Sequence, residues 1–119
     1  MRTNKRIREL NDLCRSALGA GGRLVQTNGI LALPPEEQLA IGEKVKSFND
    51  FNADNDPYGE HDFGSFKHAG SKIFWKIEYY DPKLEHHSDN PADTTKTIRV
   101  LTIMLGEEYL PHHHSRASR

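Results

Sequence analysis

The stretch from Thr97 to Leu105 constrains the fold more than any other part of this chain, because apolar side chains occupy both of its alternating faces. In an extended strand, successive side chains point to opposite faces of a sheet. One face would therefore carry Ile98, Val100, Thr102 and Met104, and the other Leu101, Ile103 and Leu105. A strand that is apolar on both faces is typical of the interior of a sheet. The stretch predicts a central strand.

Length and composition fit one small folded domain around such a strand. The chain has 119 residues, of which 35% are hydrophobic and 28% charged, and its formal net charge is −1. We expect one domain over residues 1–110, since domains cluster near roughly 100–150 residues, and a disordered polar tail over residues 111–119. The single cysteine, Cys14, excludes an internal disulfide and a metal site built from several cysteines. We assign no function to the run His112–His114 in the tail.

The sequence has no sign of a membrane segment. No apolar run approaches the roughly 20 residues that cross a bilayer, and the first residues lack the apolar region of a signal peptide. We therefore expect a cytoplasmic protein without a membrane partner. The near-neutral charge balance also falls short of the strongly basic composition of nucleic-acid binders, although residues 1–23 carry more basic than acidic side chains.

Two stretches have the three- and four-residue apolar spacing of helices that bury one face. The first covers residues 4–18, ends before Gly19, and has an apolar stripe of Ile7, Leu10, Leu13, Cys14, Ala17 and Leu18. The second covers residues 34–49, opens at two prolines followed by two acids, and would bury Leu39, Ile41, Val45 and Phe48. Gly42 inside the second helix costs about 1 kcal/mol of helix propensity, which predicts that another part of the chain packs closely there.

Two hairpins complete the pattern. Residues 23–27 and 30–33 would pair through Asn28–Gly29, a dipeptide suited to tight hairpin turns because both residues tolerate positive φ. Residues 62–68 and 72–81 would pair through residues 69–71, with one face formed by Ile73, Trp75, Ile77 and Tyr79. The order helix, hairpin, helix, hairpin, strand predicts an α+β fold in which two helices pack on one face of a small, mainly antiparallel sheet.

The densest cluster of polar side chains lies between residues 54 and 62. Its first half resembles a calcium-binding loop, but Tyr58 and Ser65 stand where that loop requires its further ligands. A looser divalent-cation site would use Asp56, Glu60, His61 and Asp62, with Asp54 as a further oxygen ligand. In the structural alternative, Asp and Asn side chains bond to their own backbone, and His61 pairs with a neighbouring carboxylate.

Phe74, Lys76 and Tyr80 share the second face of the longer hairpin with Glu78. Exposed aromatic side chains there would form a docking surface for a protein, since aromatics are enriched at interface hot spots. They could also stack on single-stranded bases, but the neighbouring acids oppose phosphate, so a protein partner is favoured over nucleic acid. Lys76 and Glu78 fit a solvated ion pair better than a nuclease cluster, in which the acid precedes the lysine.

Three longer runs are Asn55–Gly64 (NDPYGEHDFG), Phe74–Asp81 (FWKIEYYD) and Arg99–Leu105 (RVLTIML). These runs resemble an uncharacterised bacterial family, a small domain of unknown function that is often met on plasmids and other mobile elements. The resemblance covers roughly residues 5–110 and carries over neither an activity nor a catalytic residue. It implies a small accessory protein of mobile DNA, of the kind that binds host or plasmid machinery.

These observations lead to two functional hypotheses, one non-enzymatic and one enzymatic. In the first, the chain is a non-enzymatic interaction protein without a cofactor, which binds a host or plasmid-encoded protein and in one version inhibits a host-defence complex. Its predicted contact residues are Asp54, Asp56, Tyr58, Glu60, His61, Asp62, Phe74, Lys76 and Tyr80. In the alternative, the chain is a metal-dependent hydrolase or nuclease: Lys76 stabilises negative charge, and a divalent cation is held by Asp56, Glu60, His61 and Asp62.

Two weaker readings concern other partners. A DNA-binding regulator would use the basic first helix, and its binding would depend on salt. An exposed edge of the sheet would allow a homodimer.

Overall fold

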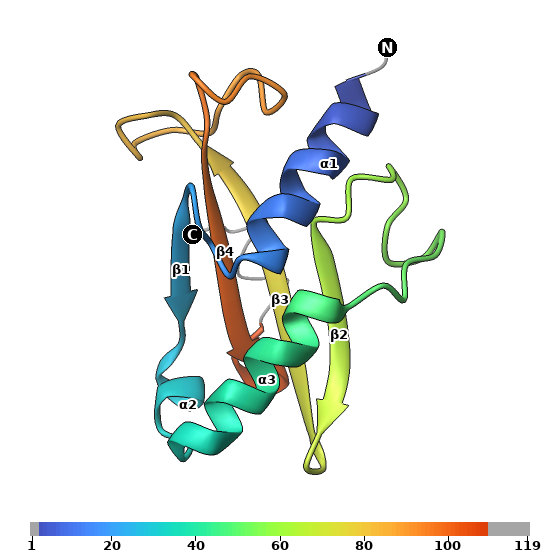
Figure 1. Ribbon diagram of the computed structural model, residues 1–119, viewed down its shortest axis with the longest axis vertical. Coiled ribbons are helices and arrows are strands. Elements are labelled where there is room, and N and C mark those ends of the chain that lie inside the picture. The colour runs from blue at the N-terminus through green and yellow to red at the C-terminus, as the bar shows by residue number, and fades with distance from the viewer. Residues whose placement is uncertain (1–2, 110–119) are drawn as a thin grey trace.

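The computed structural model describes residues 3–109, whose two long helices cover one face of a four-stranded sheet (Figure 1). In chain order the elements are α1 (Thr3–Ser16), β1 (Arg23–Gln26), α2 (Asn28–Leu31), α3 (Pro35–Ser47), β2 (Phe63–His68), β3 (Ser71–Tyr80), β4 (Ile98–Leu105) and the 3-10 helix η1 (Gly106–Glu108). The predicted α+β class is confirmed. None of the helices in this part of the chain is long and apolar enough to span a membrane. The predicted tail, residues 111–119 with His112–His114, lies outside the described residues.

The sheet has the order β1-β4-β3-β2. β4 pairs antiparallel with β3 and parallel with β1, while β2 and β3 form an antiparallel hairpin. On β4, Leu101 and Ile103 are buried on one face and Met104 on the other. The prediction that this strand lies in the interior of the sheet is therefore confirmed, and the sheet is mainly antiparallel with one parallel pair.

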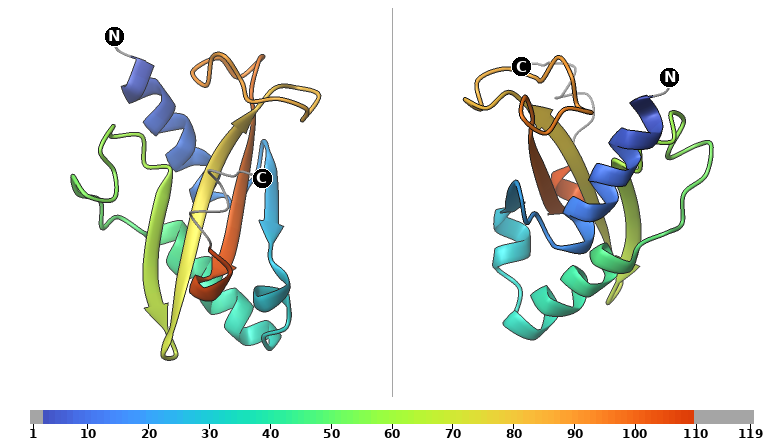
Figure 2. Two further views of the ribbon diagram at one scale, coloured as in Figure 1. Left: turned by 180° about the vertical axis from the view of Figure 1, so that it is seen from behind. Right: turned by 45° about the horizontal axis from the view of Figure 1, so that its top comes forward.

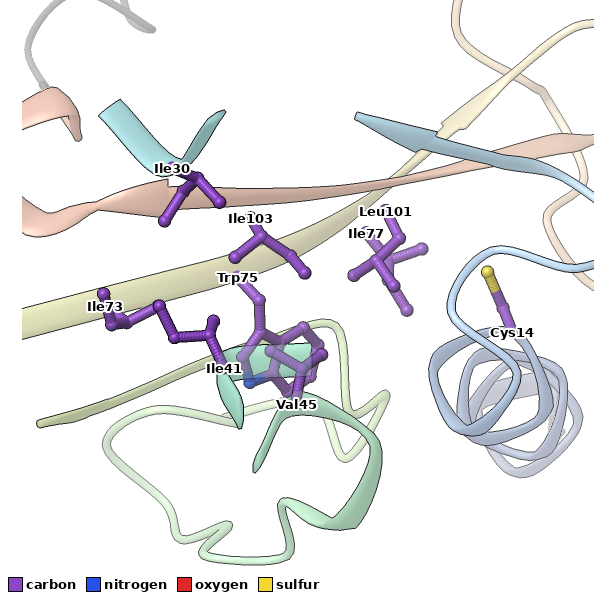
Figure 3. Close-up of a cluster of buried hydrophobic side chains, with 9 residues drawn as sticks. All are labelled: Cys14, Ile30, Ile41, Val45, Ile73, Trp75, Ile77, Leu101 and Ile103. Atoms are coloured by element: carbon purple, nitrogen blue, oxygen red, sulfur yellow. The ribbon is translucent and has the colours of Figure 1, made fainter. Parts of the chain in front are cut away.

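The hydrophobic core lies between the sheet and the helices (Figure 3). Trp75 has no exposed surface and lies among side chains from three other elements, namely Ile30, Ile41, Val45, Leu101 and Ile103. The predicted inner face of β3 is confirmed for Ile73, Trp75 and Ile77, which are all buried. Full burial of a large apolar side chain contributes roughly 1.5–3 kcal/mol, so this layer holds α1 and α3 against the sheet.

The predicted hairpin over residues 23–33 is wrong. Residues 23–26 form β1, which pairs in parallel with β4, and residues 28–31 form the short helix α2 instead of a return strand. Gly29 is not among the glycines with positive φ. A Cβ atom at Gly29 would lie 2.5 Å from Cδ1 of Leu105 and 2.7 Å from Oε1 of Glu108. The missing Cβ atom therefore allows a close approach to the side chains at the end of β4 and does not serve the φ angle of a tight turn.

Both long helices bury faces that differ in part from the predicted ones. They end at residues 16 and 47, two residues before the predicted ends. Leu13 of α1 and Leu39 of α3, which the apolar spacing places in the core, have 64% and 73% of their surfaces exposed. On α1, the buried positions are shared by Ile7 and Cys14 with the polar residues Asn11 and Arg15. A stripe drawn through apolar residues alone therefore misplaces the buried face of the helix.

The expected close approach at Gly42 is confirmed. Gly42 is buried in α3, and a Cβ atom there would lie 3.2 Å from Cδ1 of Leu18. Leu18 belongs to the turn that follows α1, so the missing side chain lets that turn pack directly on α3.

Candidate functional site

The predicted contact loop, residues 54–62, folds back against α1. Three side chains of α1 donate hydrogen bonds to three successive carbonyl oxygens of the loop: Asn4 to Tyr58 at 2.9 Å, Arg8 to Gly59 at 3.0 Å and Asn11 to Glu60 at 3.0 Å. Spacings of four and three residues place these donors on one side of the helix. The loop backbone is therefore fixed by side chains of the helix, a contact that the sequence pattern does not predict.

His61 lies between two carboxylates. Its Nδ1 is 2.9 Å from Oδ1 of Asp12, and its Nε2 is 3.6 Å from Oδ2 of Asp56. The imidazole ring stacks on Phe51 with a centroid distance of 3.7 Å and an angle of 3° between the rings. The buried carboxylate of Asp56 also accepts a hydrogen bond from the backbone N–H of His61. Both ring nitrogens of His61 are thus occupied by carboxylates of the same domain.

Glu60 points toward the inner face of the sheet. Its Oε1 accepts a hydrogen bond of 2.8 Å from the hydroxyl of Tyr79, which itself accepts one of 2.8 Å from Nδ2 of Asn11. Burial raises the pKa of Tyr79, and the hydrogen bond to Glu60 raises it further, against the opposite effect of the bond from Asn11. The hydroxyl therefore keeps its proton and acts as the donor to Glu60.

The carboxylates of the loop do not converge on one point. Burial raises the pKa of Asp62, and the charges of Glu60 and Asp56 add to this effect. Within residues 3–109, no three His, Cys, Asp or Glu side chains are grouped so that they could hold a metal ion. A metal centre needs several ligands within about 2.0–2.6 Å of one point, whereas Asp56 contacts His61 and Glu60 contacts Tyr79. The geometry gives the metal-dependent alternative no support.

Phe74, Lys76 and Tyr80 lie on the outer face of the sheet, which we define as the face opposite α1 and α3 (Figure 2, left). Phe74 packs against Phe63 and Tyr109, with centroid distances of 5.5 and 4.6 Å. Glu78 joins the other two residues, because its carboxylate lies 3.2 Å from Nζ of Lys76 and accepts a hydrogen bond of 3.1 Å from Tyr80. Burial raises the pKa of Tyr80, and the charge of Glu78 adds to it.

The predicted contact residues do not all lie on one face of the sheet. Glu60 contacts Tyr79 on the inner face, whereas Tyr80 follows Tyr79 in the strand and therefore points to the outer face. Asp54 and Tyr58 are exposed at the tip of the loop, with 73% of Tyr58 accessible. The predicted contact residues thus divide between the loop tip, the contacts with α1 and the outer face.

An apolar groove between α3 and β1 has no counterpart in the sequence predictions. Its volume is about 410 Å³, and it is lined by Leu18, Leu24, Gln26, Pro35, Gln38, Leu39, Gly42, Glu43 and Ile103. Leu39 is the sequence signal that points to it: two helix residues turn through roughly 200°, so Leu39 cannot share the face that Ile41 and Val45 bury. We call this feature the leucine groove.

Comparison with known proteins gives one match. A family model described as a protein of unknown function, DUF3768, matches residues 26–108. The chain belongs to the DUF3768 family. The resemblance to an uncharacterised family is thereby confirmed at this level. No curated protein and no solved structure matches the chain.

In this DUF3768 protein, the matched stretch begins at the last residue of β1 and ends at the last residue of η1. It contains the loop 54–62, the outer face and most of the leucine groove. α1 precedes it, although α1 supplies the three donors that fix the loop backbone. The geometry of the loop in this protein therefore depends on residues outside the matched stretch.

Proposed function

We propose that this DUF3768 protein is a non-enzymatic interaction protein that binds a partner protein through the leucine groove. The observation that carries the proposal is the exposure of two leucines at the groove, 73% for Leu39 and 40% for Leu24. Apolar side chains exposed together, with polar residues around them, are typical of protein contact sites. The groove collects such side chains, whereas the loop 54–62 uses most of its polar groups within the domain.

β1 adds unpaired main-chain groups beside the groove. It pairs with β4 on one side, and no strand within residues 3–109 pairs with its other side. An extended segment of a partner could therefore add to this edge through main-chain hydrogen bonds while its apolar side chains enter the groove. Leu24 belongs to both the strand and the groove, so it would contact such a segment directly.

The charge of the groove favours protein over nucleic acid. Its lining includes one acid, Glu43, and neither lysine nor arginine, whereas phosphate binding requires basic side chains. We take the partner to be a host or plasmid-encoded protein, with inhibition of a host-defence complex as one version of the function. This choice of partner rests on the resemblance to proteins of mobile elements, and the groove itself specifies only an apolar, extended segment.

The test compares the natural chain with two leucine variants in affinity capture from a bacterial lysate. Leu39→Asp places a charge in the groove. Leu13→Asp is the matched control, since Leu13 is also an exposed leucine on a helix, at 64%, but lies outside the groove. A protein captured by the natural chain and by Leu13→Asp is identified and purified, and its affinity is measured with each pure variant.

We expect Leu39→Asp to weaken the affinity at least tenfold and Leu13→Asp to leave it unchanged. Equal affinities for all three chains, or no specific partner in any capture, would overturn the proposal. Tyr58→Ala at the loop tip and Tyr80→Ala on the outer face should both retain the affinity. A loss with either of these, but not with Leu39→Asp, would move the contact to the residues that the sequence singles out.

A second copy of the chain is the other occupant to be distinguished. Light scattering after size-exclusion chromatography, over a range of concentrations, measures the mass in solution. We expect a monomer without the partner. A dimer that Leu39→Asp dissociates would assign the groove to self-association and overturn the proposed role.

A further inference from the structure

Arg99 borders a small cavity that is separate from the leucine groove. The cavity lies between α1, the turn that leads into β1 and the loop before β4, and its volume is about 210 Å³. Its walls include Leu10, Leu13, Cys14, Gly21, Thr94 and Arg99. No acidic residue is among the residues that line it.

Arg99 is a buried cation without a carboxylate partner. Only 6% of its surface is exposed, and no carboxylate within residues 3–109 forms an ion pair with it. Its Nε donates a hydrogen bond of 2.6 Å to Oδ1 of Asn11, and its Nη2 donates one of 2.6 Å to the carbonyl of Pro91. The guanidinium carbon also lies 5.1 Å from the centroid of the Tyr79 ring. Neutral groups thus orient the guanidinium but do not balance its charge.

Three hydrogen-bond donors that belong to residues lining the cavity have no partner in the described part of the chain. Nη1 of Arg99, the hydroxyl of Thr94 and the N–H of Gly21 make no hydrogen bond to residues 3–109. Within residues 3–109, the side-chain nitrogen and oxygen atoms that have neither solvent contact nor a hydrogen-bond partner are Nε of Arg15 and Nε1 of Trp75. Nη1 of Arg99 is not one of them, so solvent reaches it. An arginine keeps its charge in proteins, and a buried charge is unfavourable unless it is paired. Burial lowers the pKa of Arg99 and outweighs the opposite effect of the Glu60 charge.

We propose that this cavity binds a small carboxylate that carries a short apolar chain. The carboxylate accepts hydrogen bonds from Nη1 of Arg99 and from Thr94, and the apolar chain contacts Leu10 and Leu13. The volume equals roughly seven water molecules at ~30 Å³ each, so the ligand is small. The apolar wall distinguishes such a carboxylate from inorganic phosphate, which has no part that gains by leaving water.

Butanoate is the probe, and its affinity for the full chain is measured by isothermal titration calorimetry. Butylammonium has the same apolar chain with the opposite charge, and inorganic phosphate has the charge without the chain. We expect butanoate to bind and the other two to bind at least tenfold more weakly. Butylammonium or phosphate binding as tightly as butanoate would overturn the proposal, as would the absence of butanoate binding.

Variants on the wall locate the site. Leu13→Glu places an acid at the cavity, and Leu31→Glu is the matched control, because Leu31 is likewise exposed, at 53%, but lines no part of this cavity. Leu13→Glu should weaken butanoate binding at least tenfold, Leu31→Glu should leave it unchanged, and Thr94→Val should weaken it severalfold. Equal affinity for Leu13→Glu and the natural chain would overturn the assignment.

Arg99→Met is the direct variant, and its fold is checked by circular dichroism because the change also removes the hydrogen bonds to Asn11 and Pro91. A folded Arg99→Met chain should lose butanoate binding, and retained binding would overturn the proposal. If Arg99→Met does not fold, the comparison of Leu13→Glu with Leu31→Glu decides the question.

Discussion

Asn11 connects distant parts of the fold through one buried amide. Its Nδ2 donates to the carbonyl of Glu60 and to the hydroxyl of Tyr79, and its Oδ1 accepts from Arg99. These bonds join α1 to the loop 54–62, to β3 and to β4. A buried polar residue is compatible with stability when its hydrogen-bonding groups are used. Asn11 therefore stabilises the fold by linking these elements through hydrogen bonds.

Tyr79→Phe tests this network at a single atom. The change removes the hydrogen bonds with Asn11 and Glu60, and we expect the free energy of unfolding to fall by about 1–2 kcal/mol at pH 7. The pKa of Tyr79 is raised in the folded chain, whereas the unfolded tyrosine ionises near pH ~10. Stability from this group is therefore complete below pH ~10 and is lost as the pH rises above it.

Urea unfolding between neutral pH and about pH 11 measures this effect. The advantage of the natural chain over Tyr79→Phe should shrink as the pH rises above ~10. Tyr58→Phe is the control, since Tyr58 is exposed, and it should follow the natural chain throughout. A difference between the natural chain and Tyr79→Phe that is constant with pH would contradict the prediction.

At the scale of secondary-structure elements, Arg15 fixes the end of α3 to α1. Its Nη1 donates to the carbonyls of Val45, Lys46 and Phe48, and its Nη2 contacts Asp12 at 2.9 Å. The last carbonyl groups of a helix have no partner within the helix, and a cation near them is favoured by the helix dipole. One buried arginine of α1 thus supplies hydrogen-bond donors and a positive charge to the end of α3.

Arg15→Met should lower the free energy of unfolding by about 3 kcal/mol, because it leaves the carbonyl groups of Lys46 and Phe48 without the donor Nη1 and removes one of the two donors to the carbonyl of Val45. Arg6→Met is the matched control on the same helix. Arg6 forms an exposed pair with Glu9 at 3.9 Å, and such pairs contribute roughly 0–1 kcal/mol. Chemical denaturation of both variants measures the two values, and similar losses would show that Arg15 does not have the proposed role.

Glu108 joins the end of β4 to the start of α2. Its carboxylate accepts hydrogen bonds from the Thr27 hydroxyl and from the backbone N–H groups of Gly29 and Leu105. Burial alone would raise the pKa of Glu108, but these three hydrogen bonds outweigh it, and the pKa is lowered. The stability from this group is therefore present above the unfolded pKa of ~4.3 and is lost as the pH falls through the lower pKa of the folded state.

Glu108→Gln should melt at a lower temperature than the natural chain at pH 7, and the gap should narrow as the pH falls below ~4.3. Glu107→Gln is the neighbouring control, since Glu107 is exposed, and its melting temperature should not change. Calorimetry over this pH range measures the gap. A gap of the same size at every pH would exclude the charge of Glu108 as its source.

The elements that sequence predicts well are those defined by local spacing. The alternation in β3 and β4 identifies buried faces because each side chain's direction depends only on its position in the strand. The pairing of β1 with β4 joins Arg23 to Val100, and no local spacing encodes so distant a contact. For the same reason Asn28–Gly29 indicates a turn when read alone, although contacts with Leu105 and Glu108 decide its structure.

The candidate functional site is likewise predictable only where its contacts join residues that are close in sequence. The pairing of His61 with a nearby carboxylate is predictable from Asp56, five residues away, but the contact with Asp12 is not. Asn11 and Arg15 interrupt the apolar stripe of α1, so a pattern of hydrophobic residues excludes them from the buried face that they occupy. The leucine groove is missed for the opposite reason. A pattern of hydrophobic residues assigns Leu39 to the core, although Leu39 is exposed.

At the scale of the whole molecule, the stretch that matches the DUF3768 family is shorter than the domain that folds as one unit. Residues 26–108 omit α1 and nearly all of β1. A shortened chain of residues 26–108 would expose the side of the core that α1 covers. Arg99 would also lose its hydrogen bond to Asn11. We expect it to bind the dye ANS and to lack the cooperative thermal transition of the full chain. A cooperative transition at a similar temperature would contradict this prediction.

The position of β4 also bears on how the protein is made. β4 follows every other strand in the chain, yet it is the neighbour that β1 and β3 share in the sheet. On the ribosome, β1 has no strand to join until β4, which spans Ile98–Leu105, has been synthesised. Until then the nascent chain carries unpaired strand edges and uncovered apolar side chains, and we expect chaperones to bind it.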